Sequence, residues 1–269
     1  MREAVIVSAA RTPIGKAYRG AFNNTESPTM GGHAIREAVK RAGIEPEEVD
    51  DVIMGCAVQQ GTSGFNIGRT AGIVAGLPIT VSGMSIDRQC SSGMMAIATA
   101  AKQIIHDGMP IVVGAGLESI SLVQNEHQNQ YRATDPNVLK IAGAAYMPMI
   151  DTAEVVAKRY NISREVQDEY ALQSQQRTAA GQENGKFDDE IVPMPSTKVI
   201  FNQETENTVQ EDVLLEKDEG NRPSTTPEGL QVLKPVREGG VITAGNASQL
   251  SDGASASVLI DSKLAEQKG

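Results

Sequence analysis

The sequence contains no tryptophan, and aromatic residues make up only 3% of its 269 residues. Its core must therefore be built from Val, Ile, Leu, Met and Ala. Basic residues are also few, with 24 Lys and Arg against 34 Asp and Glu, which gives a formal charge of −10 and a pI of about 4.9. An acidic chain without a basic stripe excludes nucleic acid as the main partner. A few placed cations and helix N-termini can still bind a phosphorylated small molecule.

Cysteine is equally scarce, because Cys56 and Cys90 are the only two, too few for a disulfide framework. The longest uncharged stretch, residues 70–86, is interrupted by Pro78 and by several Gly, Thr and Ser residues, so it is not a membrane span. The apolar run at residues 4–10 is too short for a signal-peptide core and fits a first strand better. These absences predict a cytoplasmic chain without membrane insertion.

The rest of the composition is typical of a globular protein, with 40% apolar and 22% charged residues. Apolar runs alternate with helical patterns in the first part of the chain. The expected strands are residues 4–8, 49–58, 82–87 and 110–117, and the expected helices are residues 29–42, 66–75 and 91–106. Strands apolar enough to be buried on both faces, alternating with helices, predict an α/β fold with a mostly parallel sheet. Ser27, directly before Pro28, is the expected N-cap of the first helix. The third helix, at residues 91–106, has no charged residue in its first part, which predicts that it is buried on all sides.

The middle of the chain breaks this alternation with a polar, irregular stretch. Two helices follow it, at residues 152–160 and 163–184, and Ser163 is the expected cap of the second. Residues 204–222 are acidic and low in apolar residues, which predicts a surface segment.

Residues 253–260 return to an apolar strand that suits the sheet. We therefore predict two domains. Residues 1–118 with 250–269 form the α/β domain, and residues 119–249 form a loop domain inserted after the fourth strand.

The most informative stretch is residues 85–95, S-I-D-R-Q-C-S-S-G-M-M, in which Cys90 lies between a predicted strand and the helix that follows. Its sulfur would then be near free backbone N–H groups at a helix N-terminus, which favours the reactive thiolate. The small residues Ser91, Ser92 and Gly93 let a substrate carbonyl approach the sulfur. A nucleophile on a strand-to-helix turn is suited to acyl transfer.

The local sequence leaves a second interpretation of Cys90 open, because most free cysteines are small buried hydrophobes. For Cys56, in the strand pattern V-I-M-G-C-A-V, that interpretation is preferred, since no helix terminus or base accompanies it. The three histidines offer Cys90 no base either. His33 lies at the start of an amphipathic helix, His106 at the end of one, and His127 in a polar loop.

Three motifs, in the family's order, resemble those of thiolases. D-R-Q-C-S-S-G-M around Cys90 resembles the active-cysteine motif of degradative 3-ketoacyl-CoA thiolases. The opening V-I-V-S-A-A-R-T-P-I-G-K resembles the thiolase start, and T-A-G-N-A-S-Q-L-S-D-G-A at residues 243–254 resembles a second family signature. The resemblance implies the first half of a layered α-β-α-β-α fold with an inserted, CoA-binding loop domain. It also implies thiolysis of 3-ketoacyl-CoA or the reverse Claisen condensation, with Cys90 carrying the acyl group as a thioester.

The same resemblance implies where CoA binds. Met149, in M-P-M-I-D-T-A-E, falls where the family's loop domain contacts CoA, and Arg222 occupies the basic position near the CoA nucleotide. Ala247 and Ser248 match residues that line the pantetheine channel. Pro148 stands where the family has a His, which is a departure from its pattern. CoA and acyl-CoA are implied as substrates, while no permanently bound cofactor and no metal site are expected.

The family's second half supplies an N-E-A motif, a G-G-H motif and a second Cys in a Gly-rich turn, and none of these occurs in this sequence. We therefore expect the chain by itself to be nearly inactive. The resemblance further implies a homodimer or homotetramer and a role in fatty acid metabolism, with the C-S-S-G form favouring the degradative direction.

Three alternatives remain. The first is a non-catalytic module that binds CoA or a partner. A papain-type cysteine hydrolase is disfavoured, because no downstream His and Asn pair is placed for it. A ketoacyl synthase shares the fold and the cysteine chemistry, but its flanking motifs differ from D-R-Q-C-S-S-G.

Overall fold

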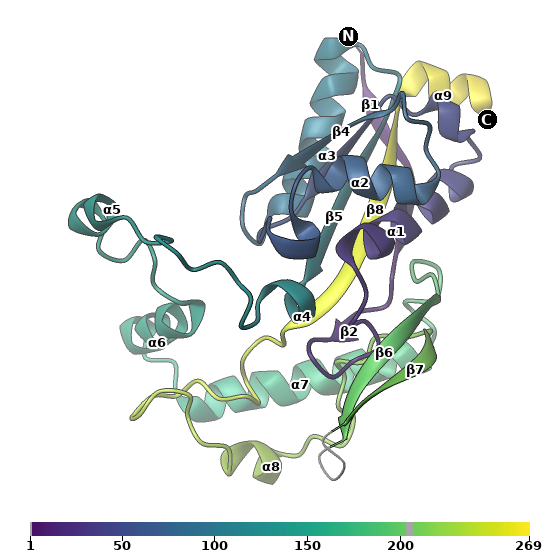
Figure 1. Cartoon of the computed structure of the whole chain (residues 1–269). Helices are drawn as coiled ribbons and strands as arrows, with labels where there is room; N and C mark the ends of the chain where they lie inside the picture. The colour runs from purple at the N-terminus through teal and green to yellow at the C-terminus, as the bar shows by residue number, and fades with distance from the viewer. Residues whose placement is uncertain (1, 203–206) are drawn as a thin grey trace. The chain divides into compact units, whose positions relative to one another are not determined.

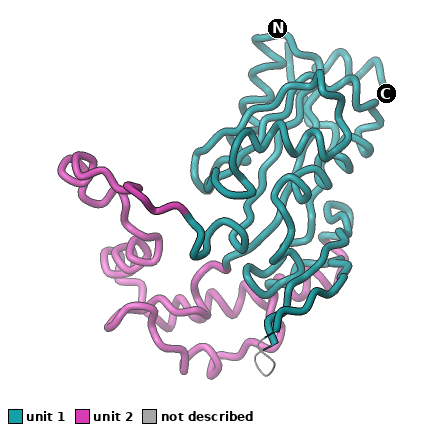
Figure 2. Tube along the Cα trace, viewed as in Figure 1, with its two compact units in different colours: residues 1–128, 187–220, 250–269 teal, residues 129–186, 221–249 magenta. Residues whose placement is uncertain are grey.

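The computed structural model describes residues 2–202 and 207–269, and it divides into two compact units. Figure 2 colours them: unit 1 comprises residues 1–128, 187–220 and 250–269, and unit 2 comprises residues 129–186 and 221–249. These boundaries differ from the predicted ones, because residues 119–128 and 187–220 belong to unit 1 instead of the insertion. Among the described residues, no helix is long and apolar enough to cross a bilayer.

The main sheet of unit 1 has the strand order β1-β8-β5-β3-β4 (Figure 1). The strands are β1 (Ala4–Arg11), β3 (Asp51–Gly55), β4 (Ser82–Ile86), β5 (Ile111–Ser119) and β8 (Ser251–Asp261), with the short β2 (Gly15–Lys16) paired to β8. β3 is parallel to β4 and to β5, whereas β8 is antiparallel to both β5 and β1. β1, β3, β4 and β5 therefore share one direction and β8 alone opposes them, which confirms the mostly parallel α/β sheet.

Helices cover both faces of this sheet. They are α1 (Ser27–Arg41), α2 (Ile67–Ala75) and α3 (Ser92–Lys102). Short 3-10 turns precede and follow β3, at Pro46–Glu48 and Gly61–Ser63. Successive residues of β5 point to opposite faces, so Val113 packs in the core under α1 and α2, while Val112 packs with Ala96 and Ala100 of α3. The C-terminal helix is α9 (Ser262–Lys268).

Three expectations for unit 1 were wrong in detail. Glu26, not Ser27, is the N-cap of α1, because the Ser27 hydroxyl lies 2.7 Å from that of Ser63 and caps nothing. α3 is buried along one stripe only, and Met94 is 76% exposed. β1 is an edge strand whose apolar side chains are largely uncovered, with Ile6 56% exposed, so it is not the buried strand that was predicted.

The predicted surface segment after unit 2's long helix contains the second strand of a hairpin, and this strand is mostly exposed. β6 (Met194–Asn202) pairs antiparallel with β7 (Asn207–Leu215), and the predicted segment 204–222 lies partly outside the described residues. The Asn23 side chain fixes the hairpin to unit 1, accepting from Val199 N at 2.9 Å and donating to Val199 O at 2.7 Å. These long-range bonds place the hairpin in unit 1.

Unit 2 is helical. Its elements are α5 (Pro136–Ile141), α6 (Met149–Tyr160), α7 (Arg164–Glu183) and α8 (Pro227–Gln231), while the short α4 (Ile120–Val123) belongs to unit 1. Ser163 is the N-cap of α7, as predicted, and its hydroxyl accepts from Val166 N at 3.4 Å.

In unit 1, the helix predicted for residues 91–106 has a different end, since α3 continues into a π-helical turn at Gln103–Asp107.

Candidate functional site

The carboxyl ends of the three parallel strands meet at one edge of the sheet, because Gly55 of β3 is in register with Ile86 of β4 and Gly116 of β5. The segments that follow these strands therefore converge. One of them is the short turn from β4 into α3, which contains Cys90. In parallel sheets this edge is where ligands usually bind.

Side-chain hydrogen bonds bracket the turn that carries Cys90. The Asp87 carboxylate accepts from Gln89 N at 2.6 Å, and the Ser92 hydroxyl accepts from Arg88 N at 2.8 Å and donates to Gln89 O at 2.6 Å. Gln89 has a φ of +49°, an uncommon value for a residue with a side chain. Cys90 follows it and is exposed, directly before the first turn of α3. The local sequence thus holds this thiol outward on a tight strand-to-helix turn.

Glycine lets the first turn of α3 lie directly against the ends of β3 and β5. A Cβ atom on Gly55 would be 2.3 Å from the backbone carbon of Ser92, and one on Gly116 would be 3.1 Å from Gly93 Cα. Contacts that close are possible only without side chains. Because Gly55 and Gly116 have no Cβ atom, the start of α3 can lie against the two strand ends, and Cys90 lies just before it.

Cys90 lines a cavity of about 530 Å³ within unit 1, formed by this turn and by residues that follow β3, end β5 and begin β8. Its charged lining residues are Arg11 and Glu118. Arg11 is paired with Asp218, with Nη1 2.7 Å from Oδ1, and Glu118 accepts from Ala57 N at 2.9 Å. Arg11 is thus paired with a carboxylate, whereas Glu118 keeps its charge and is hydrogen-bonded by backbone N–H groups. No histidine is among the lining residues that the structure describes.

Cys56 lines the same cavity but has a different character. It is buried, and its Sγ lies 3.6 Å from Oε1 of Glu118. Burial, and secondly the charge of Glu118, raise the pKa of the Cys56 thiol to about 12. This thiol remains protonated at neutral pH, which agrees with the structural role expected for Cys56. Sequence reasoning missed Glu118, since it lies 62 positions away and only the pairing of β3 with β5 brings the two together.

The contrast between the two cysteines gives a first prediction. With a pKa of about 12, the Cys56 thiolate makes up about one part in ten thousand at pH 8. We expect iodoacetamide to label one thiol, Cys90, in the native chain at pH 8, and both thiols in guanidinium chloride. Peptide mapping after brief labelling measures this, and rapid native labelling of Cys56 would contradict the described burial.

The three histidines lie away from the lining of the cysteine cavity, and His33 lies in the middle of α1 instead of at the start of a helix. His33 is in α1, where burial lowers its pKa and its Nε2 atom has no hydrogen-bond partner. His106 is exposed in the π-helical turn, and the side chain of His127 is 84% exposed. No group of three or more His, Cys, Asp or Glu residues in 2–202 and 207–269 could hold a metal ion.

Unit 2 contains a separate cavity of about 280 Å³, and two of the predicted CoA contacts, Arg222 and Ala247, line it together. Ser248 is the next residue but is not part of the lining, and Met149 opens α6, 70% exposed and also outside this cavity. Gln175 of α7 lines it too, a residue that no sequence signal marked.

The chemistry of this cavity is mixed. Arg222 supplies one cation, Ser224 and its neighbours supply hydroxyl groups, and Leu230 and Leu233 supply an apolar wall. The Gln175 side chain accepts from Arg222 N at 2.8 Å, which holds the loop that carries the cation. Such a combination fits an amphipathic ligand with an anionic group.

Comparison with known proteins assigns the family. The sequence model described as "Thiolase, N-terminal domain" matches residues 4–263. The 3-ketoacyl-CoA thiolase of Bacillus subtilis is 40% identical over 272 residues, which cover 100% of this chain and 68% of the relative, and 3-ketoacyl-CoA thiolase 1, peroxisomal, of Arabidopsis thaliana is 38% identical over 99% of this chain and 59% of the relative. The crystal structure of the Bacillus anthracis acetyl-CoA acetyltransferase has a TM-score of 0.84 and 38% identity, over 100% of this chain and 68% of that one.

This chain thus spans about three fifths to two thirds of the length of these relatives. Because the family model covers nearly all of it, the chain belongs to the thiolase family of acyltransferases, of which it carries the N-terminal domain.

Proposed function

We propose that Cys90 is the acyl-accepting nucleophile of a thiolase reaction. The observation that carries the proposal is the exposed thiol on a braced strand-to-helix turn, facing a cavity at the carboxyl edge of the sheet. In thiolysis the sulfur attacks the keto carbon of a 3-ketoacyl-CoA, the bond between that carbon and the α carbon breaks, and acetyl-CoA leaves after taking a proton. The thiol of a second CoA then attacks the thioester, releasing acyl-CoA and restoring the Cys90 thiol.

CoA binding is proposed for the cavity of unit 2. Arg222 would pair with a phosphate of the nucleotide, and the loop that contains Ala247 and Ser248 would lie along the pantetheine arm. Met149, exposed at the start of α6, remains a proposed contact. Pro148 precedes it and has no side-chain donor, so a polar contact from that position is not part of the proposal.

Among the described residues that line the Cys90 cavity, none is a free acid or base for the proton transfers of the reaction. The cysteine cavity has no histidine among its described lining residues, and its carboxylate, Glu118, is engaged by backbone N–H groups of the segment after β3. Acylation of a thiol by acetyl-CoA needs no proton transfer at carbon, whereas thiolysis must protonate the leaving enolate and condensation must deprotonate the second substrate. We therefore propose that the chain alone is acylated but turns over slowly.

The test is incubation of the chain with acetyl-CoA, followed by intact mass measurement and by a turnover assay with acetoacetyl-CoA and CoA. In the acylation step the S–C bond to CoA breaks, a new one forms on the protein, and the thiol proton leaves with CoA. We expect one acetyl group per chain and turnover at least about a thousandfold below that of an intact thiolase. Normal turnover would contradict the second expectation.

The alternative, a non-catalytic module that binds CoA or a partner, is separated by the same experiment. It predicts binding of CoA without any adduct. The unit 2 cavity is compatible with this alternative, since it requires no chemistry at Cys90.

The family resemblance leads us to propose further that the protein acts in degradative fatty acid metabolism, as a homodimer or homotetramer in the cytoplasm. The Arabidopsis relative is peroxisomal by name, whereas the name of the Bacillus subtilis relative specifies no compartment.

A further inference from the structure

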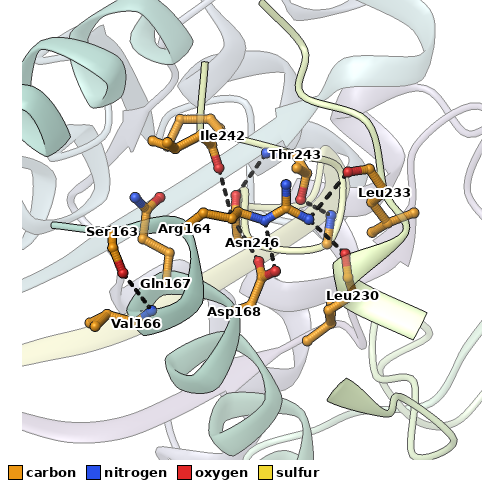
Figure 3. A network of polar contacts seen from close by, with 12 residues as sticks. Ser163, Arg164, Val166, Gln167, Asp168, Leu230, Leu233, Ile242, Thr243 and Asn246 are labelled. Atoms are coloured by element: carbon orange, nitrogen blue, oxygen red, sulfur yellow. Dashed lines mark hydrogen bonds and ion pairs between the residues drawn. The ribbon is translucent and has the colours of Figure 1, made fainter. Parts of the chain in front are cut away.

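One buried carboxylate in unit 2 joins two side chains from different segments. Asp168 of α7 is only 7% exposed. Its Oδ2 accepts from Arg164 Nε at 2.7 Å, and its Oδ1 accepts from Asn246 Nδ2 at 3.0 Å (Figure 3). Asp168 thus connects α7 to the loop that contains Ala247.

Arg164 extends the network to a third segment. Its Nη2 donates to Leu230 O at 2.6 Å and to Leu233 O at 3.2 Å, the carbonyls at the end of α8 and just after it. A cation that satisfies carbonyls at the end of a helix is favourably placed. The carboxylate that orients this guanidinium is Asp168.

Asn246 bonds to the backbone of its own loop, residues 241–247. Its Oδ1 accepts from Thr243 N at 2.8 Å, and its Nδ2 donates to Val241 O at 3.1 Å as well as to Asp168. A further backbone bond joins Ala247 N to Thr243 O at 3.0 Å. Asn246 thus joins both ends of the loop 241–247 to Asp168, while Glu154 holds its start by accepting from Val241 N at 3.0 Å and from Ile242 N at 2.9 Å.

The loop also lies directly on the end of α8. A Cβ atom on Gly245 would be 2.6 Å from side-chain carbons of both Leu230 and Leu233. These three residues and Ala247 line the 280 Å³ cavity, whereas Asp168 does not. Asp168 thus fixes two walls of the cavity without being part of either.

We propose that Asp168 is a positioning residue for CoA binding, holding the loop 241–247 and the end of α8 in the arrangement that admits the coenzyme. This inference rests on the proposed function, because it takes the unit 2 cavity as the CoA site. If the anchoring bonds are lost, the competent arrangement becomes a minor state, and the apparent dissociation constant rises in inverse proportion to its population. Loss of one hydrogen bond to a charged group corresponds to an increase of about tenfold or more in the dissociation constant.

The test is isothermal titration of CoA into wild-type chain, Asp168→Asn and the control Glu169→Gln. Asp168→Asn keeps the size of the side chain but places an NH₂ group against Arg164 or Asn246, both of which are donors. Glu169→Gln removes the same charge from the next, exposed position of α7. We expect about tenfold weaker binding for Asp168→Asn and no change for the control, with the iodoacetamide labelling rate of Cys90 equal in all three.

A second pair of variants separates positioning from loss of folding. Asn246→Asp places two carboxylates against each other and should weaken CoA binding by more than tenfold. In the double variant Asp168→Asn/Asn246→Asp, residue 168 can donate to residue 246, so at least part of the lost affinity should be recovered. General destabilisation would make the double variant worse than Asn246→Asp. If the wild-type chain binds CoA and Asp168→Asn binds it equally well, this inference is overturned but the CoA site is not. The same conclusion follows if the exchange recovers none of the lost affinity. Absence of CoA binding by the wild-type chain overturns it together with the CoA site proposed for unit 2.

Discussion

Replacing Cys90 by alanine is expected to abolish acylation by acetyl-CoA, with the rate of adduct formation falling by a factor of about a thousand or more. The reason is the lack of a substitute among the described residues that line its cavity. The nearby Ser92 hydroxyl accepts from Arg88 N and donates to Gln89 O, so its proton and one lone pair are engaged in holding the turn. Hydroxyl groups are also far weaker nucleophiles than thiolates at neutral pH.

The matched control for this prediction is Cys56→Ala, which removes the other thiol of the same cavity. Because burial and Glu118 raise the pKa of Cys56 to about 12, this thiol contributes almost no nucleophile. We expect Cys56→Ala to be acylated at the wild-type rate, with a stability loss of about 1 kcal/mol for the small void it leaves. Intact mass and peptide mapping of both variants measure the outcome. An adduct that persists in Cys90→Ala, or one mapped to Cys56, would contradict the assignment of the nucleophile.

The strand-to-helix turn could be predicted from sequence because everything that shapes it is local. The end of β4 at Ile86, the bracketing Asp87 and Ser92, and the start of α3 all lie within six positions of each other. The mostly parallel sheet was also predictable, since continuous apolar runs and intervening helices carry that information in the sequence. The order of its strands was not, because the return of β8 between β1 and β5 depends on pairing across more than a hundred residues.

The residues missed by sequence reasoning share one property, which is that tertiary structure gives them their environment. Asp168 and Gln175 belong to a helix whose many polar residues predict exposure to solvent. In the structure, however, Asp168 is buried and Gln175 lines a cavity. The hairpin of β6 and β7 was missed for a related reason. β7 carries Glu211 and Asp212 and is mostly exposed, so it lacks the apolar alternation that identifies a strand. Arg222 and Ala247 were found only through motifs, and no pattern in the sequence relates one to the other.

Replacing Gly55 by alanine is expected to destabilise the chain by about 3 kcal/mol and to displace the Cys90 turn. The added Cβ would lie 2.3 Å from the carbonyl carbon of Ser92 and 2.6 Å from Gly93 N. These are backbone atoms of the first turn of α3, which cannot rotate away as a flexible side chain can. The helix start must therefore move from the end of β3, and Cys90, two residues before Ser92, must move with it.

Gly72→Ala is the matched control, because Gly72 is equally buried but has room for a methyl group. A Cβ there would meet Val52 Cγ2 at 3.5 Å and Leu77 Cδ1 at 3.6 Å, which are ordinary contacts. Gly72 lies within α2, where alanine is favoured over glycine by about 0.5 to 1 kcal/mol, so this variant should be at least as stable as wild type. Urea unfolding measures both stabilities, and iodoacetamide labelling together with acylation by acetyl-CoA reports on Cys90. If Gly55→Ala were as stable as Gly72→Ala and equally acylated, the start of α3 could not lie against β3 as described, and the position of the nucleophile would need another cause. The opposite signs expected for the same Gly-to-Ala change follow from what surrounds each glycine, which is backbone at Gly55 and side chains at Gly72.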